Sequence, residues 1–348
     1  MQAIQLIQHN ENLQSAYKLV SDAPVPEIKD DEVLIRVEYA ALNRLDDFVR
    51  IGWPGLNLHF PHIPCADFAG TIEKIGAKVD NWRPGQHVTA NPLLWFGEDD
   101  FILRGEQNRS RASGLVGEHF SGTCAEFIKF PARNLIEIPV GFNMQKAAAA
   151  SLVYVTAWHS LITAGGLVPG EKVLIVGAGG GVNTAALHIA RMVGAQTFII
   201  ASSAEKTQKA SERGADWVHD RSTDPQWSKA VFQATDKMGI DMVVDNVGAV
   251  TWNDSLRTLR PGGRLVTVGG TSGYEAKVNV GLIFHKHLSI IGSTMGTHDD
   301  YKRVMSLVFQ KKLDPVIDTV FSMADFTDAM QHMLAGSHFG KILLKISP

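Results

Sequence analysis

Residues 171–201 read EKVLIVGAGGGVNTAALHIARMVGAQTFIIA, and the rest of the chain is organised around this stretch. An apolar run from Val173 to Val176 is followed by a glycine-rich turn, an amphipathic helix and a second apolar run from Thr197 to Ala201. This order predicts a βαβ unit. A Cβ at the strand-to-helix junction would block both the tight turn and the approach of a pyrophosphate to the helix N-terminus. The residues predicted to bind a dinucleotide in this turn are Gly177, Gly179, Gly180, Gly181 and Val182.

One position departs from the usual fingerprint, because a later glycine would fall at Val182 or Asn183. The turn is therefore a variant form. A glycine-rich turn without any ligand is the alternative. A glycine motif that follows a strand and opens a helix is stronger evidence than a lone one, so we favour dinucleotide binding.

Length and composition narrow the class of protein. A chain of 348 residues suggests two domains. With 20% charged residues, 45% hydrophobic residues and a net charge of −3, it reads as a globular protein with a small-molecule substrate and no basic field for nucleic acid or a membrane. Two cysteines exclude a disulfide framework and an all-cysteine metal site, which favours the reducing cytoplasm. The N-terminus lacks the pattern of a signal peptide.

The stretch from Ala147 to Gly170 carries no charged residue. It is poor in large aliphatic residues and is interrupted by Tyr154, His159 and Pro169. We therefore expect a buried helix followed by a loop, and no membrane span.

The pattern changes along the chain. Residues 1 to about 140 read as short strands separated by turns, an all-β pattern. Asn143 could cap a helix that carries the chain into a second domain. From Glu171 strands and helices alternate, which implies a parallel sheet. The last segment returns to a helix, Ala324–Ala335, and a strand, Lys341–Ile346.

Several motifs occur in a characteristic order. Besides the glycine turn they are ALNRLDDFVRIGW (41–53), PHIPCADFAGTIEKIG (61–76), PGQHV (84–88), GEHFSGTCAEF (117–127), DNVG (245–248), GGRLVTVGG (262–270) and GKILL (340–344). Together they resemble the medium-chain dehydrogenase/reductase superfamily, and within it the zinc-free quinone oxidoreductase and enoyl-reductase-like branch. The resemblance covers essentially the whole chain. It is specific for the superfamily and not for a substrate.

The resemblance implies an α/β fold of two domains. A GroES-like β-barrel domain would span 1–140 and be rejoined by 299–348, and a Rossmann domain with a doubly wound parallel sheet would span 141–298. It also implies a homodimer formed through the sheet edge near Leu288 to Thr294.

Zinc needs about four nitrogen, sulfur or oxygen ligands, and the resemblance indicates where they are missing. The positions of the catalytic ligands carry Asn43, Ala66 and a residue near Leu152. The positions of a structural zinc lobe carry Phe96, Asp99, Ile102 and Ser110, and we expect Phe96 and Ile102 to pack the lobe. His59, His62 and Cys65 form a competing cluster, but Pro61 and Pro64 rule out a regular helix there. We predict no metal.

The second strand of the βαβ unit decides which nicotinamide cofactor fits. A carboxylate at its end would hold the ribose hydroxyls of NAD, and a neutral or basic site tolerates the 2′-phosphate of NADP. No acid stands there, and Ser202, Ser203, Lys206 and Arg221 suit a phosphate. Ser203 could also cap the following helix, and both roles can hold. Asp220 and Glu205 lie close, yet the pattern favours NADPH over NADH.

Further site residues follow from the resemblance. Those implied near the nicotinamide are Asn43, Thr156, Val247, Gly248, Gly269, Gly270, Ser293 and Thr294. Asp46 corresponds to an acid near the active site, although it or Asp47 could only cap a short helix. Tyr154 could donate a proton or be a packed aromatic residue. Aromatic and apolar residues that could line the substrate pocket or belong to the core are Trp53, Leu56, Phe60, Trp95, Phe96 and Tyr274.

Without a metal, nothing strong polarises a simple carbonyl. Hydride addition to a quinone or an α,β-unsaturated carbonyl needs less stabilisation by the protein, because the added negative charge spreads over the π-system of the substrate. The sequence therefore predicts an NADPH-dependent reductase of such acceptors, with Asn43, Asp46, Thr156 and Tyr154 as candidate catalytic residues. The alternatives are a zinc-independent alcohol dehydrogenase-like enzyme and a non-catalytic NADPH-binding redox sensor.

Overall fold

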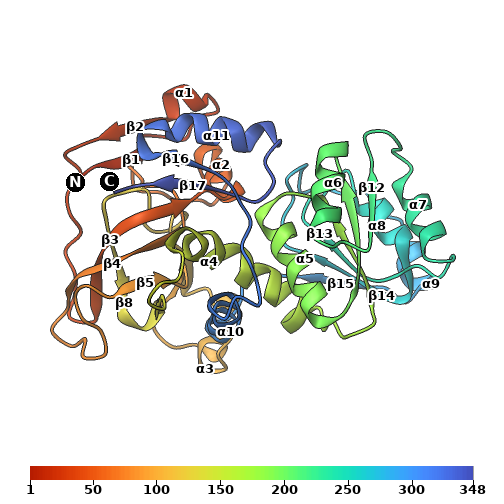
Figure 1. Ribbon diagram of the computed structural model, residues 1–348, viewed down its shortest axis with the longest axis horizontal. Coiled ribbons are helices and arrows are strands. Elements are labelled where there is room, and N and C mark those ends of the chain that lie inside the picture. Colours follow the sequence, from red (N-terminus) through yellow and green to blue (C-terminus); the bar gives the residue numbers. More distant parts are fainter. Residues whose placement is uncertain (348) are drawn as a thin grey trace. The chain divides into compact units, whose positions relative to one another are not determined.

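The computed structural model describes residues 1–347, which form two compact units (Figure 1). The first unit comprises Met1–Leu152 and the C-terminal segment from Thr297, and the second comprises Val153–Gly296. The first boundary between the two units lies after Leu152, later than the predicted boundary between residues 140 and 141. The reason is that helix α4 (Met144–Trp158) begins on the first unit, where Ala147 and Ala148 pack with Ala69 and Ile138.

A seven-stranded, mostly antiparallel sheet forms the centre of the first unit, in the order β16-β17-β3-β4-β5-β9, with β8 also paired to β3. The C-terminal strand β17 lies beside β3, with Leu343 opposite Ala41 (Figure 1, blue beside orange). The C-terminal segment therefore completes the sheet that the first 140 residues begin.

The strands of this unit are β1 (Ala3–Leu6), β2 (Tyr17–Val20), β3 (Glu32–Ala41), β4 (Asp67–Ile75), β5 (His87–Ala90), β6 (Leu93–Trp95), β7 (Ser113–Leu115), β8 (Phe127–Pro131), β9 (Leu135–Glu137), β16 (Ile317–Ser322) and β17 (Lys341–Lys345). Its helices besides α4 are α1 (Leu13–Ala16), α2 (Arg44–Ile51), α3 (Asp100–Leu103), α10 (His298–Phe309) and α11 (Phe326–Ala335), with 3-10 turns at Gln107–Arg109, Ala132–Asn134 and Met323–Asp325.

The second unit is built on a six-stranded parallel sheet in the order β12-β11-β10-β13-β14-β15. Its strands are β10 (Lys172–Val176), β11 (Gln196–Ala201), β12 (Trp217–Asp220), β13 (Ile240–Asp245), β14 (Leu259–Thr267) and β15 (Ser289–Gly292). The helices that flank this sheet in Figure 1 are α5 (Gly181–Val193), α6 (Ala204–Glu212), α7 (Trp227–Ala234), α8 (Trp252–Thr258) and α9 (Val280–His285). This is the doubly wound arrangement that the sequence predicted.

The βαβ unit forms for the expected reasons. Residues Val173–Val176 of β10 are all buried, as in a parallel strand covered on both faces. Helix α5 ends at Gly194, whose φ of 87° is the left-handed C-cap that glycine adopts without strain. The apolar face of α5 is buried as well, so this unit has its own core.

The uncharged stretch after residue 143 forms α4 and then a π-helix, His159–Ala164. Met144–Ala164 is long and apolar enough to cross a membrane by length and composition, but 78% of its most apolar window is buried inside the structure. That burial matches the core helix that we predicted.

Candidate active site

The carboxyl edge of the parallel sheet gathers the residues that we predicted to bind the cofactor. All carboxyl ends of parallel strands lie at one edge, and here Gly177 follows β10, Ser202 follows β11 and Ser293 follows β15. The strand order reverses between β10 and β13. Ligands of doubly wound sheets bind in the crevice at this reversal.

The glycine turn has the backbone that a pyrophosphate requires. Gly177 and Gly179 adopt φ values of 101° and 94°, and Gly180 is the extended N-cap of α5. A Cβ on Gly180 would meet no atom within 4 Å. An anion can therefore approach the first N–H groups of α5, which have no partner within the helix.

Asn183 explains why the turn can do without a later glycine. Its Nδ2 donates to the Gly177 carbonyl at 2.9 Å, and its Oδ1 accepts from Asn246 Nδ2 at 2.9 Å. The amide thus joins the turn after β10 to the loop after β13. The sequence alone shows the departure from the fingerprint but not this role of Asn183.

The loops after β13 and β14 pack on each other. Asp245 Oδ1 accepts the backbone N–H groups of Val247 at 2.9 Å and Gly248 at 3.2 Å. A Cβ on Gly248 would lie 2.8 Å from the Cα of Gly270. The predicted residues Val247, Gly248, Gly269 and Gly270 therefore belong to one tightly packed pair of loops.

The end of β15 is tied to the helix that precedes the glycine turn. Ser160 Oγ donates to Ser293 Oγ at 3.0 Å, and Thr156 Oγ1 donates to Met295 Sδ at 3.6 Å. Thr294 is exposed beside the buried Ser293. The structure brings together Thr156, Ser293 and Thr294, which the resemblance had placed near the nicotinamide.

The end of β11 carries no acid. The strand ends at Ala201, and the backbone N–H of Arg221 donates to the Ala201 carbonyl at 3.0 Å. Ser203 Oγ accepts the N–H of Lys206 at 3.3 Å, so Ser203 does cap α6. The carboxylate of Asp220 accepts a hydrogen bond from Ser222 Oγ in the turn that follows it, at 2.6 Å. This bond lowers the pKa of Asp220.

These residues fit a nicotinamide dinucleotide. The open face above Gly180, the α5 N-terminus and the packed loops after β13 and β14 would hold the pyrophosphate and the nicotinamide half. Ser202, Lys206 and Arg221 stand where the adenine-side ribose would lie.

In the first unit, Asn43, Asp67 and Lys341 form a buried polar cluster. Lys341 Nζ donates to Leu42 O at 2.7 Å, to Asn43 Oδ1 at 2.6 Å and to Asp67 Oδ2 at 2.8 Å. Asn43 Nδ2 also donates to Asp67 Oδ2, at 2.9 Å. The other oxygen, Oδ1, accepts the Leu152 N–H of α4 at 2.7 Å. One carboxylate therefore joins four segments of the unit.

Asp46 takes part in capping α2, as we considered: it is the N3 residue of a capping box whose N-cap is Asn43. Oδ2 accepts the Asn43 N–H at 2.8 Å, and Oδ1 accepts the Cys65 N–H at 2.8 Å. Burial raises the pKa of Asp46 to about 6, against the two backbone hydrogen bonds and Lys341, which lower it. Each oxygen of this carboxylate thus holds one backbone N–H group in place.

Tyr154 is fully buried, and its hydroxyl lies 2.9 Å from His188 Nδ1. This is the packed, satisfied aromatic residue that we kept as the alternative to a proton donor. His119 Nδ1 accepts the Leu115 N–H at 3.2 Å, so it orders its loop.

The residues at the former catalytic zinc positions do not fit a zinc ion. Ala66 and Leu152 have no ligand atom in their side chains, and Asn43 is bonded to an ammonium and a carboxylate. In the lobe, Asp99 Oδ2 accepts Ser110 Oγ at 2.6 Å, so a hydrogen bond joins two positions where thiolates would stand.

Among the described residues, histidine and cysteine offer no replacement site. His59 is exposed, whereas the buried His62 Nε2 lies 3.0 Å from Gly117 O. Within residues 1–347, no group of three or more His, Cys, Asp or Glu side chains could hold a metal ion.

Arg44, the first residue of α2, was not among the predicted site residues. Its buried Nε has no hydrogen-bond partner among the described residues. A guanidinium in this state suits an anionic group of a ligand. The sequence offered only one hint, a basic residue next to Asn43.

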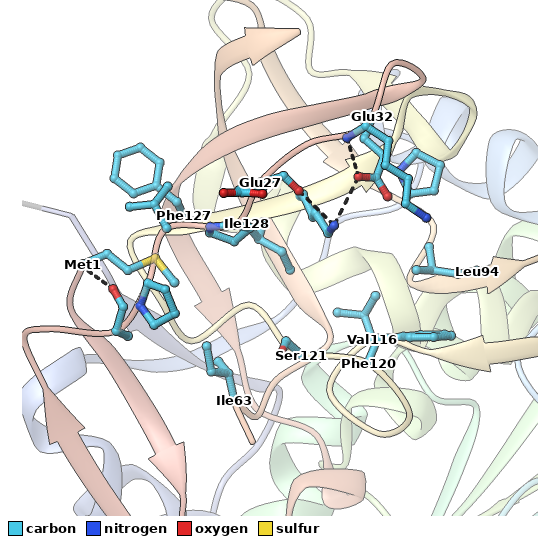
Figure 2. Close-up of a pocket in the computed structure, with 18 of the residues that line it drawn as sticks. Met1, Glu27, Glu32, Ile63, Leu94, Val116, Phe120, Ser121, Phe127 and Ile128 are labelled. Carbon is cyan, nitrogen blue, oxygen red and sulfur yellow. Dashed lines mark hydrogen bonds and ion pairs between the residues drawn. The ribbon is translucent and has the colours of Figure 1, made fainter. Parts of the chain in front are cut away.

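A separate hollow of about 770 Å³ opens in the first unit. Figure 2 shows its mainly apolar wall, with Ile63, Val116 and Phe120, and the polar end at Glu32. Lys129 Nζ lies 3.3 Å from Glu32 Oε2. None of our predicted catalytic or cofactor residues lines this hollow. Phe96, which we expected either in the substrate pocket or packing the lobe, does line it, 45% exposed and with its ring against Phe120.

The fold and the glycine-rich edge together define a two-domain protein with a Rossmann-type dinucleotide-binding unit. The family models described as "Alcohol dehydrogenase GroES-like domain" and "Zinc-binding dehydrogenase" match residues 29–140 and 181–310. A crystal structure of an NAD-dependent alcohol dehydrogenase is 34% identical, covers 100% of both chains and superposes with a TM-score of 0.95. The chain therefore belongs to the medium-chain dehydrogenase/reductase superfamily, as the sequence motifs predicted.

Two curated relatives are similar over most of their length. A zinc-type alcohol dehydrogenase-like protein of Schizosaccharomyces pombe is 28% identical over 90% of this chain and 91% of its own. An acryloyl-coenzyme A reductase of Sulfurisphaera tokodaii is 28% identical over 94% of this chain and 96% of its own. These two relatives, one named as an alcohol dehydrogenase-like protein and one as a reductase, support an oxidoreductase of this superfamily.

Proposed function

We propose that the protein is an NADPH-dependent reductase of quinones or α,β-unsaturated carbonyl compounds that works without zinc. The proposal rests on the side chains around Asp67, which do not form a set of zinc ligands. Asn43, Ala66 and Leu152 stand where zinc ligands would be needed, and the nearby oxygens bind the Lys341 ammonium. Without a Lewis acid, a simple carbonyl is poorly polarised, whereas a conjugated acceptor spreads the added charge over its own π-system.

The chain's residues bind and orient the reactants. A bound nicotinamide supplies the hydride. The glycine turn and the α5 N-terminus bind its pyrophosphate, and the loops after β13 and β14 fix the position of the ring. Arg44 supplies a guanidinium for an anionic group. Alignment of this kind can supply much of the rate acceleration.

The preference for NADPH rests on the end of β11. Ala201 leaves no carboxylate to hold the ribose hydroxyls, and Lys206 and Arg221 supply two positive charges. The neighbouring Asp220 lies at the end of β12, and its Oδ1 accepts two hydrogen bonds from Ser222.

The relatives support two acceptor classes. The name of the acryloyl-coenzyme A reductase denotes reduction of a conjugated thioester. The name of the NAD-dependent alcohol dehydrogenase denotes an alcohol and NAD. The ligand positions of this chain favour the first class.

The test is oxidation of NADPH and of NADH by the purified protein with quinones, enones, enoyl thioesters and simple ketones, each with and without a chelator. We expect turnover of conjugated acceptors, faster with NADPH, that survives chelation. Activity on simple alcohols or ketones that the chelator abolishes would favour the alcohol dehydrogenase. Tight NADPH binding with every acceptor inert would favour the redox sensor.

We extend the proposal to assembly and compartment. Strand β15 is the edge of the parallel sheet and exposes Ile290, which suits pairing with the same edge of a second copy. Cys65 and Cys124 are both unoxidised and buried, as suits the cytoplasm.

A further inference from the structure

The hollow in the first unit has the size and the wall of a ligand site. Its volume of about 770 Å³ lies within the range of pockets that hold small organic molecules. All of its lining residues lie between Met1 and Pro131, so it belongs to the first unit alone. Leu94, Val116 and Ile128 of its wall are also members of this unit's buried core. Core packing therefore holds the wall in place without a ligand.

Two large apolar side chains that line the hollow are in contact with water. Val25 is 46% exposed and Phe96 is 45% exposed. The ring of Phe96 meets that of Phe120 edge to face, with 5.5 Å between the centroids. Figure 2 shows Phe120 and Ile63 on the wall of the same space. A ligand with an apolar body would cover these side chains, and an aromatic ring in that body would add a contact of the same kind.

The polar end of the hollow offers one acceptor and one donor close together. Lys129 Nζ lies 3.3 Å from Glu32 Oε2 and donates to Glu27 O at 2.9 Å. Glu32 Oε2 also accepts the Lys29 N–H at 2.9 Å. Among residues 1–347, no donor reaches Glu32 Oε1, and the contacts of Lys129 leave the third N–H of its ammonium unused.

The charges around this end are balanced. The charged side chains that line the hollow are Glu27, Glu32, Lys29 and Lys129, two of each sign. The side chain of Glu32 is only 12% exposed, so a charged ligand would place an uncompensated charge beside a largely buried carboxylate. A hydroxyl group adds no charge, and it can donate to Glu32 Oε1 while it accepts from Lys129 Nζ.

We propose that the hollow is a binding site for an uncharged amphipathic molecule, such as an alcohol with an apolar body, whose polar head lies between Glu32 and Lys129. None of the residues assigned to the cofactor or to catalysis lines the hollow. The site therefore binds its ligand without NADPH, and the inference does not depend on the proposed reaction.

The test measures binding of four probes to the full-length protein by calorimetry, without NADPH. The probes share a phenyl ring on a butyl chain and differ in the head: phenylbutanol, its methyl ether, protonated phenylbutylamine and phenylbutyrate. We expect saturable binding of phenylbutanol with a Kd on the order of 1 mM or tighter. The ether cannot donate to Glu32, and we expect it to bind roughly tenfold more weakly. The two charged probes should be weaker still.

Two variants reverse the preference for an uncharged head. Glu32→Gln leaves the Lys129 ammonium unbalanced, so phenylbutyrate should become the best probe. Lys129→Met leaves the Glu32 carboxylate unbalanced, so protonated phenylbutylamine should become the best probe. Lys78→Met is the matched control, because Lys78 pairs with Asp30 at 3.2 Å and does not line the hollow. It should keep the wild-type order.

A third variant locates the probe. Ser121 is exposed and lines the hollow, so Ser121→Trp should fill part of the space and abolish binding of phenylbutanol. Ser211→Trp, an equally drastic change on the exposed face of α6, should bind as the wild type does.

A wild type that does not bind phenylbutanol, or that binds all four probes equally, would overturn the inference. So would wild-type affinity in Ser121→Trp, which would place the probe elsewhere on the protein. If Glu32→Gln does not fold, Lys129→Met decides alone, because the Lys129 side chain is 39% exposed and tolerates replacement. An unchanged order of probes in that variant overturns the inference.

Discussion

At the scale of single residues, the ion pair between Lys341 and Asp67 is the most consequential contact of the first unit. Both side chains are buried and 2.8 Å apart. Removing one partner leaves an uncompensated buried charge, which costs about 3–5 kcal/mol. We expect Lys341→Met to lose about that much stability, and the double variant with Asp67→Asn to regain most of it. Calorimetry of the four proteins checks this, and additive losses would contradict it.

Asp46 predicts a pH dependence of stability. Burial raises its pKa from 3.8 to about 6. A raised folded-state pKa gives a contribution to stability that is complete below the unfolded value and is lost as pH rises through the folded value. The stability difference between the wild type and Asp46→Asn should therefore shrink as pH rises from about 4 to above 6. Unfolding midpoints across that range measure it, and a constant difference would refute the shift.

At the scale of elements, the turn between β10 and α5 requires glycine at position 177. An alanine there would be strained at φ 101° and would bring its Cβ within 2.8 Å of Asn183 Nδ2. Backbone strain of this kind costs roughly 1–2 kcal/mol, and displacement of Asn183 adds to it. We expect Gly177→Ala to weaken NADPH binding as well as stability. Gly262→Ala, at φ 75° with nothing within 4 Å, is the matched control and should keep NADPH affinity.

The residues between β11 and α6, with the nearby Arg221, lead to a prediction about the choice between NADPH and NADH. A charge-assisted hydrogen bond contributes roughly 1.5–3 kcal/mol, so loss of one to a 2′-phosphate weakens binding about 10- to 100-fold. Arg221→Ala should weaken NADPH by that factor and leave NADH unchanged, as measured by nucleotide fluorescence. The exposed Arg213→Ala is the control. Equal effects on both cofactors would remove Arg221 from the phosphate site.

At the scale of the whole molecule, the edge strand β15 predicts the oligomeric state. Light scattering should give twice the chain mass of 38.0 kDa. Ile290 on β15 is 40% exposed, so Ile290→Lys should give monomers, because a charge opposes pairing of the two edges. Val320→Lys on β16, an edge strand of the other sheet with 37% exposure, should stay dimeric. A monomeric wild type would refute the dimer.

The order of motifs along the whole chain, through its resemblance to a known superfamily, predicted the superfamily and the two-domain fold. Local sequence patterns predicted the βαβ unit and the glycine turn. These features depend on residues within a few positions of one another: apolar runs that fill a buried strand, and glycines whose φ values other residues avoid. The cap provided by Ser203 and the buried helix α4 were predictable for the same reason. The boundary between the two domains at α4 was harder to predict from the sequence, because it depends on what the two ends of this helix pack against.

Only the tertiary structure decided which residues of the candidate site contact one another. Asn43 and Lys341 are 298 positions apart, and they meet because β17 pairs with β3 and β3 with β4 in a particular register. The link from Asn183 to Asn246 likewise depends on β13 lying beside β10. Such contacts follow from strand order and register, which no local pattern in the sequence encodes. The resemblance therefore indicated which side chains stand at the zinc-ligand positions, and the structure showed that one of them, Asn43, is bound to the Lys341 ammonium.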